Sequence, residues 1–130
     1  MFQLPPFLRK DLPRLADFLA LLPKTLRAAF EFRHVSWFDD AVYEALRSHG
    51  AALCIAEAED LATPLVATAS WGYLRLRLTD YDEAGLAGWA KKVEALAGAW
   101  SEAFVYFKHE EAGIGPKLAN AFVTALGKTA

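Results

Sequence analysis

Charged and hydrogen-bonding side chains gather at the carboxyl ends of the segments that have β-strand character. They are Gln3, Glu31, Arg33, His34, Glu57, Arg75, Arg77, Lys108 and His109. Arginine side chains in such a position can hold a carboxylate or a phosphate through paired N–H donors. A glutamate beside them can transfer a proton. The residue types therefore predict a site for a small anionic ligand, with Glu31 and Glu57 as the candidate catalytic carboxylates.

The alternation of side chains along a strand places four of these residues on one side of the predicted sheet. It turns Glu31 and Arg33 to the side away from the helices, and it turns Arg75 and Arg77 to the same side. In a barrel of parallel strands, side chains from alternate strands share a layer, so we expect Glu31 to meet Arg75 across the interior. The pair fits a structural ion pair and a ligand-binding role about equally well.

Two aromatic residues outside the predicted strands and helices are further candidates for the ligand site. Trp37 and Tyr81 fall in loops above the strand ends, where they could line a pocket for a planar or sugar-like ligand. Packing of the loops explains both of them equally well. His34 has a similar alternative, because it could cap the end of its strand.

The whole chain alternates short apolar runs with amphipathic helical stretches. Four runs read as strands, at residues 28–34, 51–57, 71–77 and 103–108. A helix is predicted before the first run, with Asp11 as its N-cap, and after the first, third and fourth runs, while residues 58–70 after the second run read as a loop. The opening residues 2–6 resemble the stub of a preceding strand. This alternation is typical of an α/β fold with parallel strands, and four such units make about half of a (β/α)₈ barrel, which takes about 250 residues.

Composition limits the classes of protein that the chain can belong to. Its 130 residues are 55% hydrophobic and 23% charged, which excludes intrinsic disorder and predicts one folded domain over residues 1–130. A net charge of −2 gives no broad basic surface for nucleic acid or an anionic membrane. The single cysteine, Cys54, lies in an apolar run and cannot form an intramolecular disulfide. Because no signal peptide or membrane-length apolar run is present, we expect a cytoplasmic location.

Two other chemistries are possible at the strand ends. Residues 110–115 form a glycine-containing loop before the last helix, where many barrels bind phosphate, but Pro116 lacks an amide and two glutamates repel an anion. The loop's turns alone would also explain its glycines. A metal-dependent hydrolase is the further alternative, with hard or borderline ligands at Glu31, Glu57, His34 and His109. No tight ligand spacing supports a metal, so none is assigned, and the cofactor stays unknown.

Four motifs occur in order along the chain. They are Phe2-Gln3-Leu4-Pro5-Pro6, Glu31-Phe32-Arg33-His34 with the following Ser36-Trp37-Phe38, Tyr73-Leu74-Arg75-Leu76, and Tyr106-Phe107-Lys108-His109-Glu110. Together they resemble the YecE-like family, which is catalogued as domain of unknown function 72. The resemblance implies a TIM-barrel-like fold about twice this length, of which the chain matches the C-terminal half. It implies no particular reaction.

The chain departs from the pattern of that family at three places. Many members carry Asp where this chain has Glu57, His-Gly where it has Arg77-Leu78, and an Asn pair where it has Lys108-His109. A mechanism for members with His-Gly and Asn-Asn therefore does not carry over to this chain.

Half of a barrel leaves backbone hydrogen-bonding groups of its edge strands without partners. An open sheet of parallel strands leaves two edges and an inner face uncovered. We therefore expect a homodimer or a complementing N-terminal half. Assembly of this kind is also the main non-enzymatic alternative for the function, and a truncated relic without activity is another.

Overall fold

The computed structural model describes residues 1–78, 81–107 and 114–129. Its elements follow in the order β1 (Phe2–Gln3), α1 (Leu12–Leu21), β2 (Ala29–Glu31), η1 (Val35–Trp37), α2 (Asp40–Ser48), β3 (Ala52–Glu57), β4 (Trp71–Leu76), α3 (Glu83–Leu96), β5 (Glu102–Phe107) and α4 (Ile114–Thr129). The expected alternation of strands and helices is confirmed, and so is the short strand at the start of the chain.

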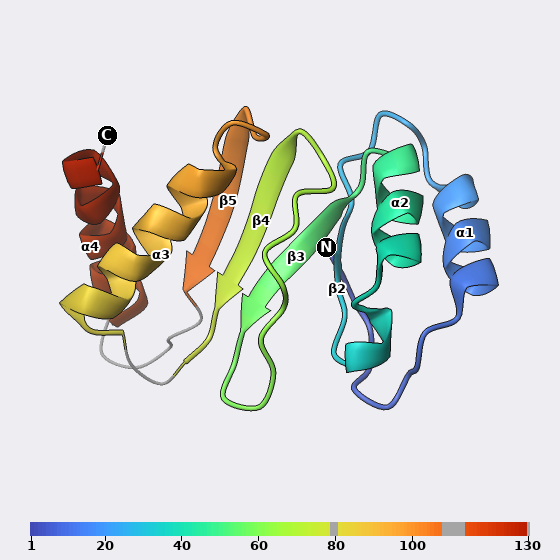
Figure 1. Cartoon of the computed structure of the whole chain (residues 1–130), viewed down its shortest axis with the longest axis horizontal. Coiled ribbons are helices and arrows are strands. Elements are labelled where there is room, and N and C mark those ends of the chain that lie inside the picture. The colour runs from blue at the N-terminus through green and yellow to red at the C-terminus, as the bar shows by residue number, and fades with distance from the viewer. Residues whose placement is uncertain (79–80, 108–113, 130) are drawn as a thin grey trace.

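The five strands form one parallel sheet in the order of the sequence, β1-β2-β3-β4-β5 (Figure 1). Each strand therefore pairs with the strands that precede and follow it along the chain. The carboxyl ends of all five strands lie at the same end of the sheet, where a parallel α/β fold collects its functional polar side chains. β1 and β5 are the edge strands.

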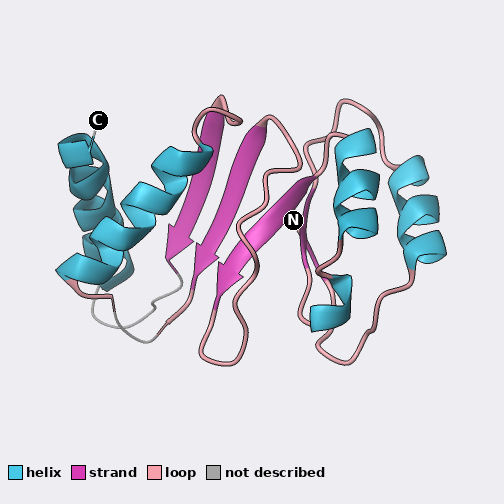
Figure 2. Ribbon diagram, viewed as in Figure 1, coloured by secondary structure: helices cyan, strands magenta, loops and turns pink. Residues whose placement is uncertain are grey.

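The helices cover one face of the sheet (Figure 2). Phe30 of β2 and Leu53 of β3 pack in one hydrophobic cluster with residues of α1 and α2. Ile55, Leu74 and Leu76 pack in a second cluster with residues of α3 and α4. The alternation of side chains then turns the other residues of each strand to the opposite face, which is called the inner face below.

The inner face of β3 carries only small side chains. Ala52, Cys54 and Ala56 point to this side between β2 and β4, and all three are buried. On β4 and β5 the inner face is aromatic, because Trp71 lies 6.0 Å from Phe104 and Tyr73 lies 5.2 Å from Tyr106, measured between ring centroids.

Aspartate side chains begin three of the helices. Asp11, Asp39 and Asp82 are the N-caps of α1, α2 and α3, and each accepts the backbone N–H of the residue three positions on, at 2.7–3.1 Å. These bonds satisfy amide groups that no helical carbonyl can reach. The predicted cap at Asp11 is confirmed.

Two expected boundaries are wrong. The strand predicted over residues 28–34 ends at Glu31, because His34 accepts the Ser36 backbone N–H at 3.1 Å and begins the 3₁₀ helix instead. The loop predicted over residues 110–115 is too long, since α4 already begins at Ile114. Pro116 then lies in the first turn of α4, where a missing N–H costs nothing.

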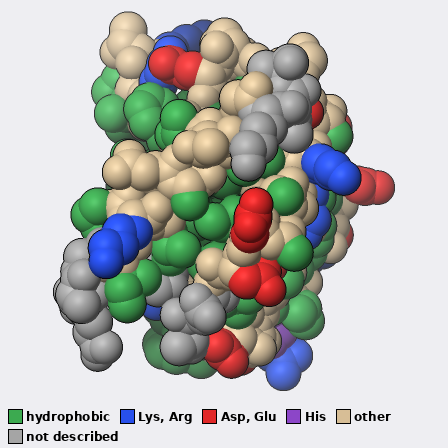
Figure 3. Space-filling model, turned by 90° about the vertical axis from the view of Figure 1, so that its left-hand side faces the viewer, with side chains coloured by type: hydrophobic (Ala, Val, Ile, Leu, Met, Phe, Trp, Pro, Cys, Tyr) green, Lys and Arg blue, Asp and Glu red, His purple; other side chains and the backbone are tan. Residues whose placement is uncertain are grey.

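Charge is dispersed on the face of the molecule seen from the α3–α4 side. Figure 3 shows basic and acidic side chains there in several small groups among hydrophobic and neutral ones. Within the described part of the chain, none of the helices has the length and apolar character needed to cross a membrane. The cytoplasmic location stays a prediction.

The close contact between Gly72 and Trp100 allows the packing of β4 to be tested by substitution. A Cβ atom at Gly72 would lie 2.7 Å from the Trp100 ring. We expect Gly72→Ala to lower the free energy of unfolding by about 1–3 kcal/mol, because the indole must move. Gly88→Ala is the matched control, since Gly88 in α3 has open space around it and alanine favours a helix by about 0.5–1 kcal/mol. Urea unfolding measures both, and equal midpoints would contradict the packing.

Candidate functional site

A buried carboxylate forms the centre of the polar site at the inner face. Glu31, the last residue of β2, is 0% exposed. Its Oε1 lies 2.6 Å from Nη1 of Arg75. Its Oε2 lies 3.5 Å from Nη1 of Arg33 and 3.9 Å from Nη1 of Arg77. The structure thus brings together the four charged residues that strand alternation placed on one side, including the expected pair of Glu31 with Arg75.

The small side chains of β3 allow this contact. Glu31 lies on β2 and Arg75 on β4, so the ion pair crosses the strand between them. Ala56 is the register partner of Arg75, and Cys54 places its Sγ 3.8 Å from Oε1 of Glu31. Burial, and next the charge of Glu31, raises the pKa of Cys54, so this residue stays a neutral thiol.

Positive charge exceeds negative charge in this group. Arg33, Arg75 and Arg77 face the single carboxylate of Glu31. Asp60 also reaches Arg33, but at 4.0 Å and with its side chain 78% exposed, so water screens its charge. All three arginines retain some solvent exposure. Their remaining N–H donors are suited to an anion that enters from solvent.

Gln3 lies beside this group. It is the register partner of Glu31 on the edge strand β1, so its side chain shares the inner face, and it is exposed to solvent. Its amide could add a neutral donor or acceptor to the ligand site.

Glu57 lies on the opposite side of the sheet. It is the register partner of Leu76, and its Oε1 accepts a hydrogen bond from Nε1 of Trp89 in α3 at 3.0 Å. The hydroxyl of Tyr81 also hydrogen-bonds to its side chain. The structure therefore separates the two candidate catalytic carboxylates, with Glu31 at the inner face and Glu57 under the helices.

Tyr81 belongs to this second group. Its hydroxyl accepts the backbone N–H of Leu78 at 3.1 Å, and burial is the main cause of a raised pKa. Together with Glu57 and Trp89 it lines a hollow of about 400 Å³ beside α3. Tyr81 is thus placed at a hollow, but on the opposite side of the sheet from the arginines.

His34 and Trp37 have local contacts that account for their positions. Nδ1 of His34 lies 2.9 Å from Oγ of Ser36 and accepts its backbone N–H. Trp37 is buried, stacks on Phe32 at 4.7 Å, and donates from Nε1 to the carbonyl of Leu8 at 2.8 Å. Both residues serve the turn after β2, and Trp37 packs with the α1 and α2 cluster.

The remaining candidates lie outside the described residues. These are Lys108 and His109, with the glutamates and the first glycine of the loop at residues 110–113. Among the residues that the structure does describe, no three His, Cys, Asp or Glu side chains are grouped so that they could hold a metal ion.

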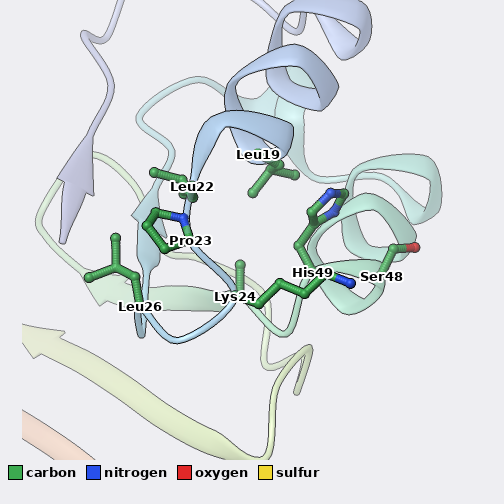
Figure 4. Close-up of a pocket in the computed structure, with 8 residues that line it drawn as sticks. Leu19, Leu22, Pro23, Lys24, Leu26, Ser48 and His49 are labelled. Carbon is green, nitrogen blue, oxygen red and sulfur yellow. The ribbon is translucent and has the colours of Figure 1, made fainter.

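Another hollow, of about 330 Å³, lies at the other end of the sheet. Figure 4 shows its lining, from the end of α1 with Leu19 and Leu22 to His49 after α2. Ala51, just before β3, also borders it, so this hollow faces the amino ends of the strands. It contains none of the candidate residues, and parallel α/β folds carry their chemistry at the opposite end.

Comparison with known proteins now gives the family. The whole chain, residues 1–130, matches the family described as "Protein of unknown function DUF72". The chain belongs to the DUF72 family. Among proteins with curated descriptions, no match is found.

Solved DUF72 structures share the fold. A DUF72 protein of Enterococcus faecalis V583 superposes with a TM-score of 0.78 at 15% identity, over 96% of this chain and 57% of its own. One of Thermotoga maritima MSB8 gives a TM-score of 0.68 at 21% identity, over 98% of this chain and 55% of its own. The predicted TIM-barrel-like α/β class is confirmed. The chain spans little more than half the length of these relatives.

Sequence reasoning missed one member of the site in this DUF72 chain and left another unassigned. Asp60 follows β3 in a loop, and nothing in its sequence context links it to Arg33. Cys54 was not assigned to the site, and only the pairing of β2 with β3 brings it to Glu31. Strand register would have found Cys54, while the contact of Asp60 depends on the path of a loop, and a single sequence contains neither.

The ion-pair group gives a test of its role in stability. We expect Glu31→Gln to lower the free energy of unfolding by about 3 kcal/mol, because three guanidinium groups lose the charge that balances them. Glu44→Gln is the matched control. Glu44 pairs with Arg47 on the exposed surface of α2, so its loss changes stability by less than about 1 kcal/mol. Chemical unfolding measures the free energy of unfolding of both variants. An unchanged value for Glu31→Gln would mean that the arginines do not depend on this carboxylate.

Proposed function

We propose that this DUF72 chain binds a small anionic ligand, bearing a phosphate or a carboxylate, at the carboxyl ends of its strands. The observation that carries the proposal is the group of three arginines around one fully buried carboxylate. Among the described residues, this one buried carboxylate leaves about two of the three positive charges unbalanced in a partly dehydrated place, and an incoming anion would balance them.

The arginines have different parts in this proposal. Arg75 makes the shortest contact to Glu31, at 2.6 Å, and is thereby held in place. Arg77 follows the end of β4 and reaches Glu31 only at 3.9 Å, so its donors are the most available to a ligand. Arg33 is the third donor, and it shares its charge with Asp60. Outside the described residues, Lys108 would add another positive charge.

Glu31 acts in this proposal as a positioning residue. It fixes the guanidinium groups, so they need not be ordered when the ligand arrives. A proton-transfer role for Glu31 stays a prediction for a ligand that reacts. Glu57 supports no step at this site, because it faces α3 and is engaged by Trp89.

The proposal predicts binding of inorganic phosphate that depends on Arg77. Phosphate should raise the melting temperature of the wild-type chain, because binding stabilises the folded state by RT ln(1 + c/Kd), where c is the free phosphate concentration. Arg77→Ala should weaken apparent phosphate affinity about tenfold, the worth of one charge-assisted hydrogen bond, and Arg77→Lys should recover part of it. Thermal melts over a phosphate titration at constant ionic strength measure this.

Arg14→Ala is the control for this titration, since Arg14 is an exposed arginine on α1 far along the sheet from β4. It should bind phosphate like the wild type. Equal phosphate responses in Arg77→Ala and the wild type would remove the proposal.

Assembly is a second candidate function, favoured by the uncovered inner face. Phe104 and Tyr106 of the edge strand β5 are 38% and 48% exposed, and the strand at the other edge is β1. We propose that another polypeptide, either a second copy or a complementing half, pairs with these edges.

This second proposal predicts the mass of the purified chain in solution. Light scattering should give at least twice 14.3 kDa, because an open parallel sheet gains hydrogen bonds and buried area by association. A monomer that melts cooperatively at micromolar concentration would contradict pairing with a second copy. A complementing half would then remain as a separate test, by co-expression.

A further inference from the structure

An exposed aromatic ring lies next to the arginines on the inner face. Tyr106 of β5 is the register partner of Arg75 on β4. In a parallel sheet, register partners point to the same side and lie on strands about 4.8 Å apart. The Tyr106 backbone therefore lies beside that of Arg75, and its phenol ring is on the same face of the sheet as the guanidinium groups around Glu31.

The ring is supported on one side and open on the other. Its centroid lies 5.2 Å from that of Tyr73, with the two planes tilted by 36°. The Tyr106 side chain is nevertheless 48% exposed. A ring held in place by a neighbouring ring and still open to solvent offers a surface on which another planar group can stack.

The ring of Trp71, nearer the amino ends of the strands, is not open to such a group. Arg27 lies over the ring of Trp71, 5.6 Å from its centroid, and pairs with Glu102 at the start of β5. Trp71 itself is buried and packs against Phe104. A planar ligand would thus find its open ring surface at Tyr106, one residue from the end of β5 and at the level of Arg75.

We propose that the anionic ligand also carries a planar aromatic ring, which stacks on Tyr106 while its phosphate or carboxylate is held by Arg75 and Arg77. A nucleoside monophosphate or another aryl phosphate has this chemistry. The inference rests on the anion site proposed above, and it adds the class of ligand.

The experiment compares ligands that differ by one part. Adenosine monophosphate has the ring and the phosphate, ribose 5-phosphate lacks the ring, and adenosine lacks the phosphate. Calorimetric titration of the full chain should show adenosine monophosphate binding about tenfold more tightly than ribose 5-phosphate, the gain of one stacked base. Phenyl phosphate against methyl phosphate asks whether a simple aryl ring gives the same gain.

Variants of Tyr106 assign that gain to the ring. Tyr106→Ala should reduce binding of adenosine monophosphate to the level of ribose 5-phosphate and leave ribose 5-phosphate unchanged. Tyr106→Phe should keep the preference. Phe7→Ala is the matched control, because it removes an exposed ring that is 83% exposed in the segment after β1, and it should change neither ligand.

The outcomes separate the two proposals. Equal affinities of the wild type for adenosine monophosphate and ribose 5-phosphate, or a preference that survives in Tyr106→Ala, would overturn the stacking inference and leave the anion site standing. Absence of binding by every phosphate would overturn both. A preference lost only in Tyr106→Ala supports the inference, and the phenyl phosphate arm tells whether a nucleoside is needed.

Discussion

The inner face of this sheet is organised by the need to balance one buried charge. A carboxylate that is taken out of water costs several kcal/mol unless charged and hydrogen-bonding partners surround it. Glu31 meets this need with Arg75 at 2.6 Å and with Arg33 and Arg77 farther away. The three arginines depend on Glu31 in turn, since without it they would repel one another in a poorly solvated place.

The packing that stabilises the fold and the proposed binding site lie on different faces of the sheet. The helix side holds both large hydrophobic clusters, in which Phe30 and Leu74 pack among leucines and aromatic residues. Glu57, at the end of β3 on this side, is hydrogen-bonded to Trp89. Among the described residues, the inner face carries three arginines around Glu31 and the exposed ring of Tyr106. The proposed anion-binding surface could therefore stay exposed without weakening the packing that maintains the fold.

Strand alternation in the sequence was enough to predict the centre of the site. Once Phe30 is assigned to the helix side, Glu31 must face Arg75, and the structure agrees. Glu57 could not be sorted in the same way, because nearly every residue of its strand is apolar and alternation gives no contrast. For Trp37 the sequence left a pocket and loop packing equally open, and in the structure the residue is buried in the 3₁₀ helix that follows the cap at His34. Register and tertiary packing decide such cases, and neither is written in a single sequence.

The small side chains on the inner face of β3 affect how substitutions could alter this site. Ala56 has no polar atom and contacts no ligand in the proposed arrangement, yet its methyl group sets how closely β2 and β4 side chains approach each other. A larger residue there would act as a spacer that pushes the carboxylate and the guanidinium apart. The charge balance of the inner face could thus be adjusted by side-chain volume alone, at a position that an inspection of charged residues would pass over.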